Sequence, residues 1–312
     1  MHGQEPQHQT ETGMETDRDI SDAARDGASE ARNPVAAPLE KAPLFKAPRE
    51  RFLEVRGTIT QQQTVVFGLV GVIAFFGVWE IFHYLTPETQ RKFLPSVEQV
   101  VGKIFLLFAE RDYVTDVGIS IYRIYLSFFA ACLLAVPLGL MMGTFVKLRA
   151  LINPTVGGWR YLPAASFVPL LLVYLGPTDL SKLALLFLGC VFFLIALILD
   201  NVLAVPKELV ESAQTMGANR RHIVLKVILP ASAPQILDSM RNMIAVSWTY
   251  LVIAEIVAAT SGIGAVMMRA ARFLHVDIIM AGILTIGVLG VLTDIGFRLA
   301  SRFLFPHLHA RH

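Results

Sequence analysis

The stretch ESAQTMGANRRHIVLKVILP, residues 211–230, decides the fold because it separates two strongly apolar segments with a polar one. Residues 207–216 predict a helix whose apolar side chains form one stripe. The stripe consists of Leu209, Val210, Ala213 and Met216. Gly217 suits the left-handed residue that ends a helix, and Asn219 suits the N-cap of a second one. We expect this second helix to stop before Pro230.

The predicted helix pair has two interpretations. Connections between helices usually span only a few residues, whereas this one is long, doubly helical and capped at its turn. A rigid and partly apolar helix pair of this kind would suit docking to a partner. Amphipathic connections also pack on their own domain, so this pattern alone leaves both interpretations open.

The composition of the 312-residue chain favours a membrane protein. Hydrophobic residues make up 54% and charged residues 17%, against about 25% charged in an ordinary soluble domain. The mean hydropathy is +0.56. A net charge of +2 gives no reason to expect a nucleic-acid partner. Cys132 and Cys190 lie inside apolar runs and read as buried side chains, with no disulfide or metal spacing.

Six apolar segments are long enough to predict membrane-spanning helices, since about 20 residues cross a bilayer core. They are residues 65–84, 119–145, 156–175 with a core from Leu162, 183–205, 236–259 and 278–303. The predicted fold is therefore all-α, a polytopic helical bundle. Pro163 and Pro169 are expected to bend the third span.

The flanking segments have other compositions. Residues 1–48 are polar and rich in proline, so we expect a disordered cytoplasmic tail. No apolar core of a cleavable signal precedes Val65. Residues 49–64 alternate arginines with apolar residues, which predicts an interfacial helix. Residues 65–305 then form the membrane domain with the polar segment 206–230, and 306–312 form a C-terminal tail.

Basic residues near the span ends favour one orientation. Placing both termini in the cytoplasm puts the basic groups of segment 206–230 on that side as well. The bias is not clean, because the long connection between the first two spans also carries four basic residues: Arg91, Lys92, Lys103 and Arg111.

The polar segment also resembles a known family. Permease subunits of binding-protein-dependent ABC importers carry the pattern EAA, three residues, Gly, nine residues, Ile, one residue, Leu-Pro. Here it reads Glu211-Ser212-Ala213, then Gly217, then Val227-Ile228-Leu229-Pro230. Ser212 and Val227 depart from the pattern with a small and an apolar residue.

The resemblance covers residues 94–305 and is greatest to the nitrate, sulfonate and taurine branch. Ser127 stands where many relatives have glycine. The stretches that support the branch are Leu94-Pro95-Ser96; Pro137-Leu138-Gly139 with Gly143; Leu162-Pro163 with Pro169-Leu170; and Ala254-Glu255 with Gly262-Ile263-Gly264.

This resemblance implies a transport subunit of type I importer architecture in a bacterial inner membrane, with no chemistry of its own. It implies a second permease subunit, often identical, a cytoplasmic ATP-binding subunit and a periplasmic solute-binding protein. ATP and Mg would bind the partner ATPase, so no cofactor or metal is expected on this chain. The residues implied in ATPase coupling are Glu211, Ser212, Ala213, Met216, Gly217, Arg220, Arg221, Leu229 and Pro230.

The sequence has no phosphate-binding loop of the G-x-x-x-x-G-K-[ST] type. The pair Gly102-Lys103 is followed by isoleucine and lacks the upstream glycine. Energy would then come from a partner or from an ion gradient, and a secondary transporter is the alternative, although no clear internal repeat is visible. An intramembrane enzyme is a weaker alternative, since the histidines form no catalytic or metal spacing.

Charged residues inside the spans have structural and functional interpretations. Glu255 is expected to pair with Arg269, Arg272 or Arg123, or to act as a gate. Arg123 is a candidate for attracting an anionic solute, although it could instead snorkel to the interface. Asp294 and Arg298 are spaced to pair on one helix face.

Candidate residues of the translocation pathway come from the spans with prolines, aromatics or charges. They are Arg123, Pro163, Pro169, Trp248, Tyr250 and Glu255. Trp248 and Tyr250 have packing as the alternative role. The solute implied by the resemblance is a small anion such as nitrate, a sulfonate or taurine.

Overall fold

The computed structural model describes residues 59–257 and 260–306, and its regular elements in these ranges are all helices, which confirms the all-α prediction. The chain divides into two units, residues 1–64 and 65–312. The predicted tail 1–48 and most of the predicted interfacial helix and C-terminal tail lie outside the described residues. Residues 61–64, at the end of the predicted interfacial helix, form the first turn of the first span.

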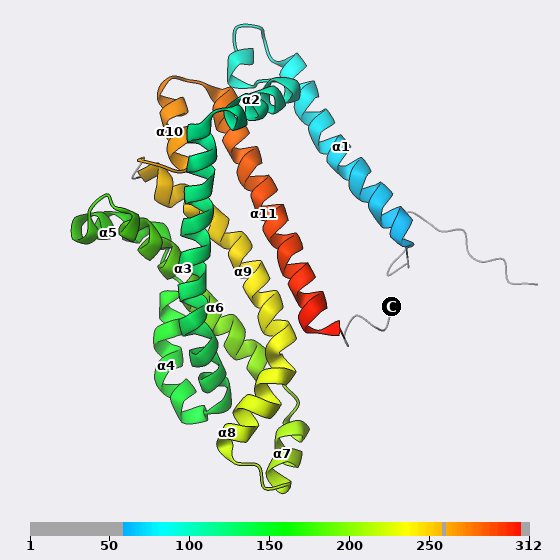
Figure 1. Ribbon diagram of the computed structural model, residues 1–312, viewed down its shortest axis with the longest axis vertical. Coiled ribbons are helices and arrows are strands. Elements are labelled where there is room, and N and C mark those ends of the chain that lie inside the picture. The colour runs from blue at the N-terminus through cyan, green and yellow to red at the C-terminus, as the bar shows by residue number, and fades with distance from the viewer. Residues whose placement is uncertain (1–58, 258–259, 307–312) are drawn as a thin grey trace, which may run out of the picture. The chain divides into compact units, whose positions relative to one another are not determined.

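Figure 1 shows the order of the helices along the chain. They are α1 (Gln61–Leu85), η2 (Arg91–Phe93), α2 (Val97–Ala109), α3 (Arg111–Thr144), α4 (Val146–Trp159), η3 (Ala164–Phe167), α5 (Val168–Leu175), α6 (Asp179–Leu203), α7 (Lys207–Thr215), α8 (Arg220–His222), η4 (Ile223–Ile228), α9 (Leu229–Val257), α10 (Ile263–Arg272) and α11 (Val276–Leu304).

Five of the helical stretches in the described ranges are long and apolar enough to cross a membrane. They are α1, α3, α6, α11 and the continuous helix of residues 220–257, which has 38 residues. The pair formed by α4 and residues 164–175 passes the same test but is bent by 82°. The six predicted segments are therefore present, with the bent pair as the third.

The expected bend of the third span is confirmed, and the chain breaks there at residues 160–163, so the span consists of two helical arms. Pro163 precedes η3, and Pro169 lies in the first turn of α5, where a missing N–H costs no helical hydrogen bond. Trp159 stacks on Phe167 and Phe192, with ring centroids 5.5 and 4.9 Å apart, and so holds the two arms of the bend together.

The predicted end of the second helix of the polar segment before Pro230 is wrong. The chain passes from α8 through η4, a π-helix, into α9 without a break, and Pro230 lies in the first turn of α9. A π-turn widens the helix and shifts its hydrogen bonds by one residue, which leaves room for a proline ring. The second helix of the polar segment therefore continues into the apolar span as one helix.

Helices α3, α6 and α9 pack side by side (Figure 1). A Cβ atom on Gly139 of α3 would lie 2.7 Å from Cγ2 of Ile198, and one on Gly143 would lie 2.3 Å from Cγ1 of Val202. Small residues at such contacts let membrane helices approach closely. The Pro137-Leu138-Gly139 stretch with Gly143 thus marks the α3–α6 contact.

The Leu94-Pro95-Ser96 stretch joins α1 to α2. Ser96 caps α2 by accepting from Gln99 N, while the Gln99 side chain accepts from Ser96 N. Three side chains of α1 hold the same stretch: Trp79 Nε1 donates to Pro95 O at 3.0 Å, His83 Nδ1 lies 2.6 Å from Leu94 O, and Glu80 Oε2 accepts from Val97 N at 3.0 Å.

The two cysteines are buried and free, as predicted. Cys190 Sγ lies 2.8 Å from Ser247 Oγ, a contact between α6 and α9. Ser127 is also buried, and its hydroxyl has no hydrogen-bond partner in the described part of the chain.

Candidate functional site

The polar segment folds as a helix, a glycine turn and a second helix, as predicted. Gly217 has a φ of +79°, the left-handed region that favours glycine. Its N–H donates to Gln214 O at 2.9 Å, and Ala218 N–H donates to Ala213 O at 3.0 Å. This pair of bonds is the Schellman arrangement, which satisfies carbonyls at the end of α7. The turn is therefore fixed by the backbone itself.

The second helix begins at a side-chain cap. Asn219 Oδ1 accepts a hydrogen bond from His222 N at 2.9 Å, which confirms the predicted N-cap. Since α8 continues through η4 into α9, the cap at Asn219 is the end of a membrane-spanning helix. We call residues 206–230 the elbow.

The predicted coupling residues occupy different environments in the elbow. Ala213 is 5% exposed and packs in the same cluster as Ile223 and Ile228, so it holds α7 against the bundle. Met216, at 82% exposed, is presented outward. Leu229 is half-buried, and the remaining predicted coupling residues are exposed: Glu211, Ser212, Gly217, Arg220, Arg221 and Pro230.

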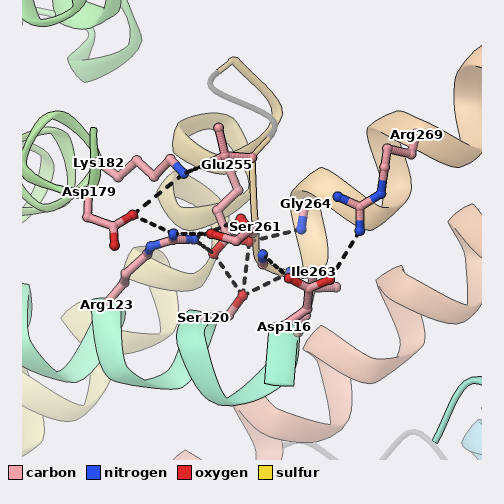
Figure 2. Close-up of polar contacts among 12 residues, drawn as sticks. Asp116, Ser120, Arg123, Asp179, Lys182, Glu255, Ser261, Ile263, Gly264 and Arg269 are labelled. Carbon is pink, nitrogen blue, oxygen red and sulfur yellow. Dashed lines mark hydrogen bonds and ion pairs between the residues drawn. The ribbon is translucent and has the colours of Figure 1, made fainter. Parts of the chain in front are cut away.

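A second site lies at the other end of α9, where Glu255 is fully buried (Figure 2). Its carboxylate accepts from Ser120 Oγ at 2.8 Å, from Arg123 Nη1 at 2.8 Å and from Gly264 N at 2.9 Å. A buried carboxylate is costly unless it is paired and hydrogen-bonded, and these donors from α3 and α10 meet that requirement.

Arg123 is the centre of this site. Its side chain is 0% exposed and also reaches Asp179 Oδ1 at 2.5 Å, Ser261 O at 2.9 Å and Ser261 Oγ at 2.6 Å. Its Nε atom has no partner in the described part of the chain. One guanidinium therefore connects α3, the start of α6, the end of α9 and the chain before α10.

Two further groups extend the site. Lys182, whose side chain is 1% exposed, donates to Thr260 Oγ1 at 2.7 Å and lies 3.7 Å from Asp179 Oδ1. Asp116 accepts from Gly262 N at 2.6 Å and pairs with Arg269 at 3.1 Å. We call Asp116, Arg123, Asp179, Lys182, Glu255 and Arg269 the ion cluster. Its three cations, Arg123, Lys182 and Arg269, balance its three carboxylates, Asp116, Asp179 and Glu255.

The ion cluster shows which of its predicted partners Glu255 pairs with. Of the three predicted partners of Glu255, Arg123 is the one that pairs with it, while Arg269 pairs with Asp116. Snorkelling of Arg123 is wrong, because its guanidinium is completely buried. A neutral and hydrogen-bonded arrangement of this kind ties helix ends together.

Sequence reasoning missed Asp116, Ser120, Asp179 and Lys182. A signal was available for the first two, since Asp116, Ser120 and Arg123 follow helical spacing and so share one face of α3. Asp179 and Lys182 lie three positions apart, a local pairing pattern, whereas their contacts with Arg123 and Thr260 join residues far apart in the chain.

The aromatic pathway candidates of α9 pack inside the bundle. Trp248 is 4% exposed and lies in a cluster with Ile124, Leu186 and Leu251. Tyr250 covers Gly189 of α6, where a Cβ atom would lie 2.8 Å from its Cδ2.

The predicted pair of Asp294 and Arg298 is present, with Nε and Oδ2 2.8 Å apart. Arg241 of α9 also pairs with Asp294, which ties α9 to α11. Within the described ranges, no group of three His, Cys, Asp or Glu side chains is placed to hold a metal ion.

Fold and sites together define a polytopic α-helical membrane protein, with a rigid polar elbow at one end of a span and a neutral ion cluster at the other. Residues 135–306 match the family model described as "binding-protein-dependent transport system inner membrane component". The chain belongs to this family, and the resemblance inferred from its elbow is confirmed.

Individual relatives are similar over most of the chain. The taurine transport system permease protein TauC of Escherichia coli (strain K12) is 31% identical over 82% of this chain and 94% of the relative. A putative aliphatic sulfonates transport permease protein of Bacillus subtilis (strain 168) is 28% identical over 75% of this chain and 86% of the relative.

Among solved structures, inward-facing conformations of the MetNI methionine ABC transporter match with a TM-score of 0.55. The identity is 19%, over 61% of this chain and 94% of that one, so this likeness concerns the fold alone.

Proposed function

We propose that this permease forms the translocation pathway of an importer and that its elbow receives mechanical work from a separate ATP-hydrolysing subunit. The proposal places the chain in a bacterial inner membrane, with the elbow and both termini in the cytoplasm. The main support for this proposal is the rigid structure of the elbow. Gly217 and Asn219 fix its turn, Ala213 anchors it, and Met216 is presented outward.

The proposed partners follow from the same arrangement. The exposed face of α7 that carries Leu209, Ser212 and Met216 would meet the ATP-binding subunit, which holds ATP and Mg. Ala213 would act indirectly, through the position it gives to α7. A second permease subunit, in our proposal a second copy of this chain, would complete the pore, and a periplasmic solute-binding protein would deliver the solute. No cofactor is proposed on this chain.

The proposed solute is a small anion such as nitrate, a sulfonate, taurine or a related compound. Similarity to taurine, sulfonate and bicarbonate permeases supports this class. Competition by taurine, an alkanesulfonate, nitrate and bicarbonate against one labelled solute in the assembled transporter would rank them.

The broken third segment is the proposed lining of the pathway. Non-helical backbone at membrane depth is tolerated where it is buried in protein or lines a wet cavity, and residues 160–163 break the helix next to Pro163 and Pro169. Arg123, Trp248 and Glu255 are buried in packing or in the ion cluster, so the geometry supports structural roles for them.

Two substitutions of Gly217 test the coupling role. Gly217→Val places a β-branched residue at a φ of +79°, a strain of about 1–3 kcal/mol, and should uncouple solute uptake from ATP hydrolysis without preventing membrane insertion. Gly217→Asn is the control, since asparagine tolerates this conformation, and should keep uptake coupled. Normal coupled uptake by Gly217→Val would contradict the proposal.

Vesicles that contain only this chain distinguish the proposal from a transporter driven by an ion gradient. Under the proposal, they should show no uptake when an ion gradient is imposed. Gradient-driven uptake without the ATP-binding subunit would favour a secondary transporter.

A further inference from the structure

A cavity of about 570 Å³ lies on the bundle side of the elbow. Its walls come from the end of α3, the start of α4, the end of α6, α7 and the start of the helix that follows. The volume is within the range of small-molecule sites, about 300–1,000 Å³. Most of the lining is apolar, including Val146, Val202, Leu203 and Ile223.

Cations from three different elements converge on this apolar cavity. They are Arg149 of α4, Lys207 of α7 and Arg220 of α8, and Glu211 is the one carboxylate in the lining, so the lining charges sum to 3 − 1 = +2. None of the three cations forms an ion pair within residues 59–257 and 260–306. The ion cluster, in contrast, is neutral. The cavity therefore offers unneutralised positive charge beside an apolar surface.

The cavity also lies where two spans end. Helix α3 ends at Thr144 and α6 at Leu203, and both residues line it. The ends of membrane-spanning helices lie at the headgroup region, and basic pockets between spans at the cytoplasmic side bind anionic lipid headgroups.

The cavity and the proposed ATPase-docking surface lie on opposite faces of α7. At 100° per residue, Lys207, Val210, Glu211 and Gln214 group on one side of α7, and all four line the cavity. Leu209, Ser212 and Met216 group on the other side. An ATP-binding subunit docked on the face of Met216 would leave the cavity to another ligand.

We propose that this cavity binds the headgroup of an anionic phospholipid. Arg149, Lys207 and Arg220 surround the phosphate, while Val146 and Leu203 contact the upper acyl chains. The bound lipid fills the space between α7 and the bundle and so supports the angle of the elbow. The proposal rests on the proposed function only for its cytoplasmic location.

The test uses the assembled transporter in nanodiscs of phosphatidylcholine, with and without phosphatidylglycerol. Native mass spectrometry measures retained phosphatidylglycerol, and thermal unfolding measures its effect on stability. The variant Arg149→Gln with Lys207→Gln should retain phosphatidylglycerol roughly thirtyfold more weakly, at about 1 kcal/mol per cation. The control Lys147→Gln with Lys226→Gln removes the same charge from exposed residues outside the cavity lining and should retain the lipid like the wild type.

Three outcomes would overturn the proposal. One is equal retention of the two lipids by the wild-type transporter, and another is equal weakening by both double variants. The third is an equal stabilisation by inorganic phosphate in phosphatidylcholine alone, which would assign the cavity to a soluble anion. Gly217→Val should lose coupling but retain phosphatidylglycerol like the wild type, so failure of the proposed function and failure of this proposal are distinguishable.

Discussion

The carboxylate of Glu255 occupies the space that a side chain at Gly262 would need. A Cβ atom on residue 262 would lie 2.1 Å from Glu255 Oε1, and Gly262 has a φ of +99°. Gly264 is similarly confined, with a Cβ position 2.7 Å from the Cβ of Glu255. The stretch Gly262-Ile263-Gly264 therefore folds closely around the acid, which accepts a hydrogen bond from the N–H of Gly264.

Replacing Gly262 with alanine should destabilise the permease strongly, because the new methyl group displaces the carboxylate from Arg123. Loss of a buried ion pair costs about 3–5 kcal/mol, and the backbone strain adds about 1–3 kcal/mol. The measurement is the amount of folded, detergent-soluble transporter and its unfolding temperature. Gly176→Ala is the matched control. Its φ is also positive, at +68°, but the nearest atom to the new Cβ would be 3.8 Å away. Similar losses in both variants would refute the steric argument.

A double-mutant cycle should reveal strong coupling between Arg123 and Glu255. Arg123→Gln and Glu255→Gln each leave one buried charge without its main partner, at a cost of about 3–5 kcal/mol. The double variant removes both charges and should lose less than the sum, with an interaction energy of about 0.5–3 kcal/mol. Denaturation of the assembled transporter in detergent measures the four species. Additive losses would mean that the pair does not act as a unit.

The contact between Gly189 and Tyr250 allows a test of whether Tyr250 packs inside the bundle or lines the translocation pathway. Gly189→Ala should cost about 1–3 kcal/mol through overpacking, since its Cβ would lie 2.8 Å from the ring. Adding Tyr250→Ala removes the ring atoms and should restore assembly. Gly287→Ala is the control, because no atom lies within 4 Å of its Cβ position, and it should assemble normally. If Tyr250 only packs, solute selectivity is unchanged in the rescued variant. A changed ranking of competing anions would show that Tyr250 lines the pathway.

The two arginines that bind Asp294 should differ in importance. Arg298 is 61% exposed and pairs within one helix, so Arg298→Ala should cost at most about 1 kcal/mol. Arg241 is 27% exposed and joins α9 to α11, so Arg241→Ala should cost more. Thermal unfolding in one detergent compares the two variants, with Asp294→Asn as the reference that weakens both pairs. A larger loss from Arg298→Ala would contradict this order.

Features that depend on neighbouring residues were predictable. The turn at Gly217 and the cap at Asn219 use hydrogen bonds between residues three to five positions apart, so the local pattern contains the necessary information. The Asp294–Arg298 pair is of the same kind. The pairing of Arg123 with Glu255 joins residues 132 positions apart, and the sequence offered three possible partners.

Of two expectations that rested on prolines, one failed for a physical reason and one was confirmed. Pro230 was expected to end a helix, but the preceding π-turns of η4 make room for its ring. Pro163 and Pro169 were expected to bend the third span, and the 82° bend lies beside them, with Trp159 joining the two arms through ring stacking. At Pro230, hydrogen bonds over a wider range replaced the local preference.

The uninterrupted helix of residues 220–257 forms a single rigid connection between opposite membrane surfaces. Its 38 residues measure roughly 57 Å at 1.5 Å each, with the Asn219 cap at one end and Glu255 near the other. A tilt imposed on the capped end displaces the far end by simple leverage. In the proposed function, movement of the elbow driven by ATP hydrolysis on the partner subunit would reach the opposite side of the bilayer through one piece of backbone, without a relay of side chains.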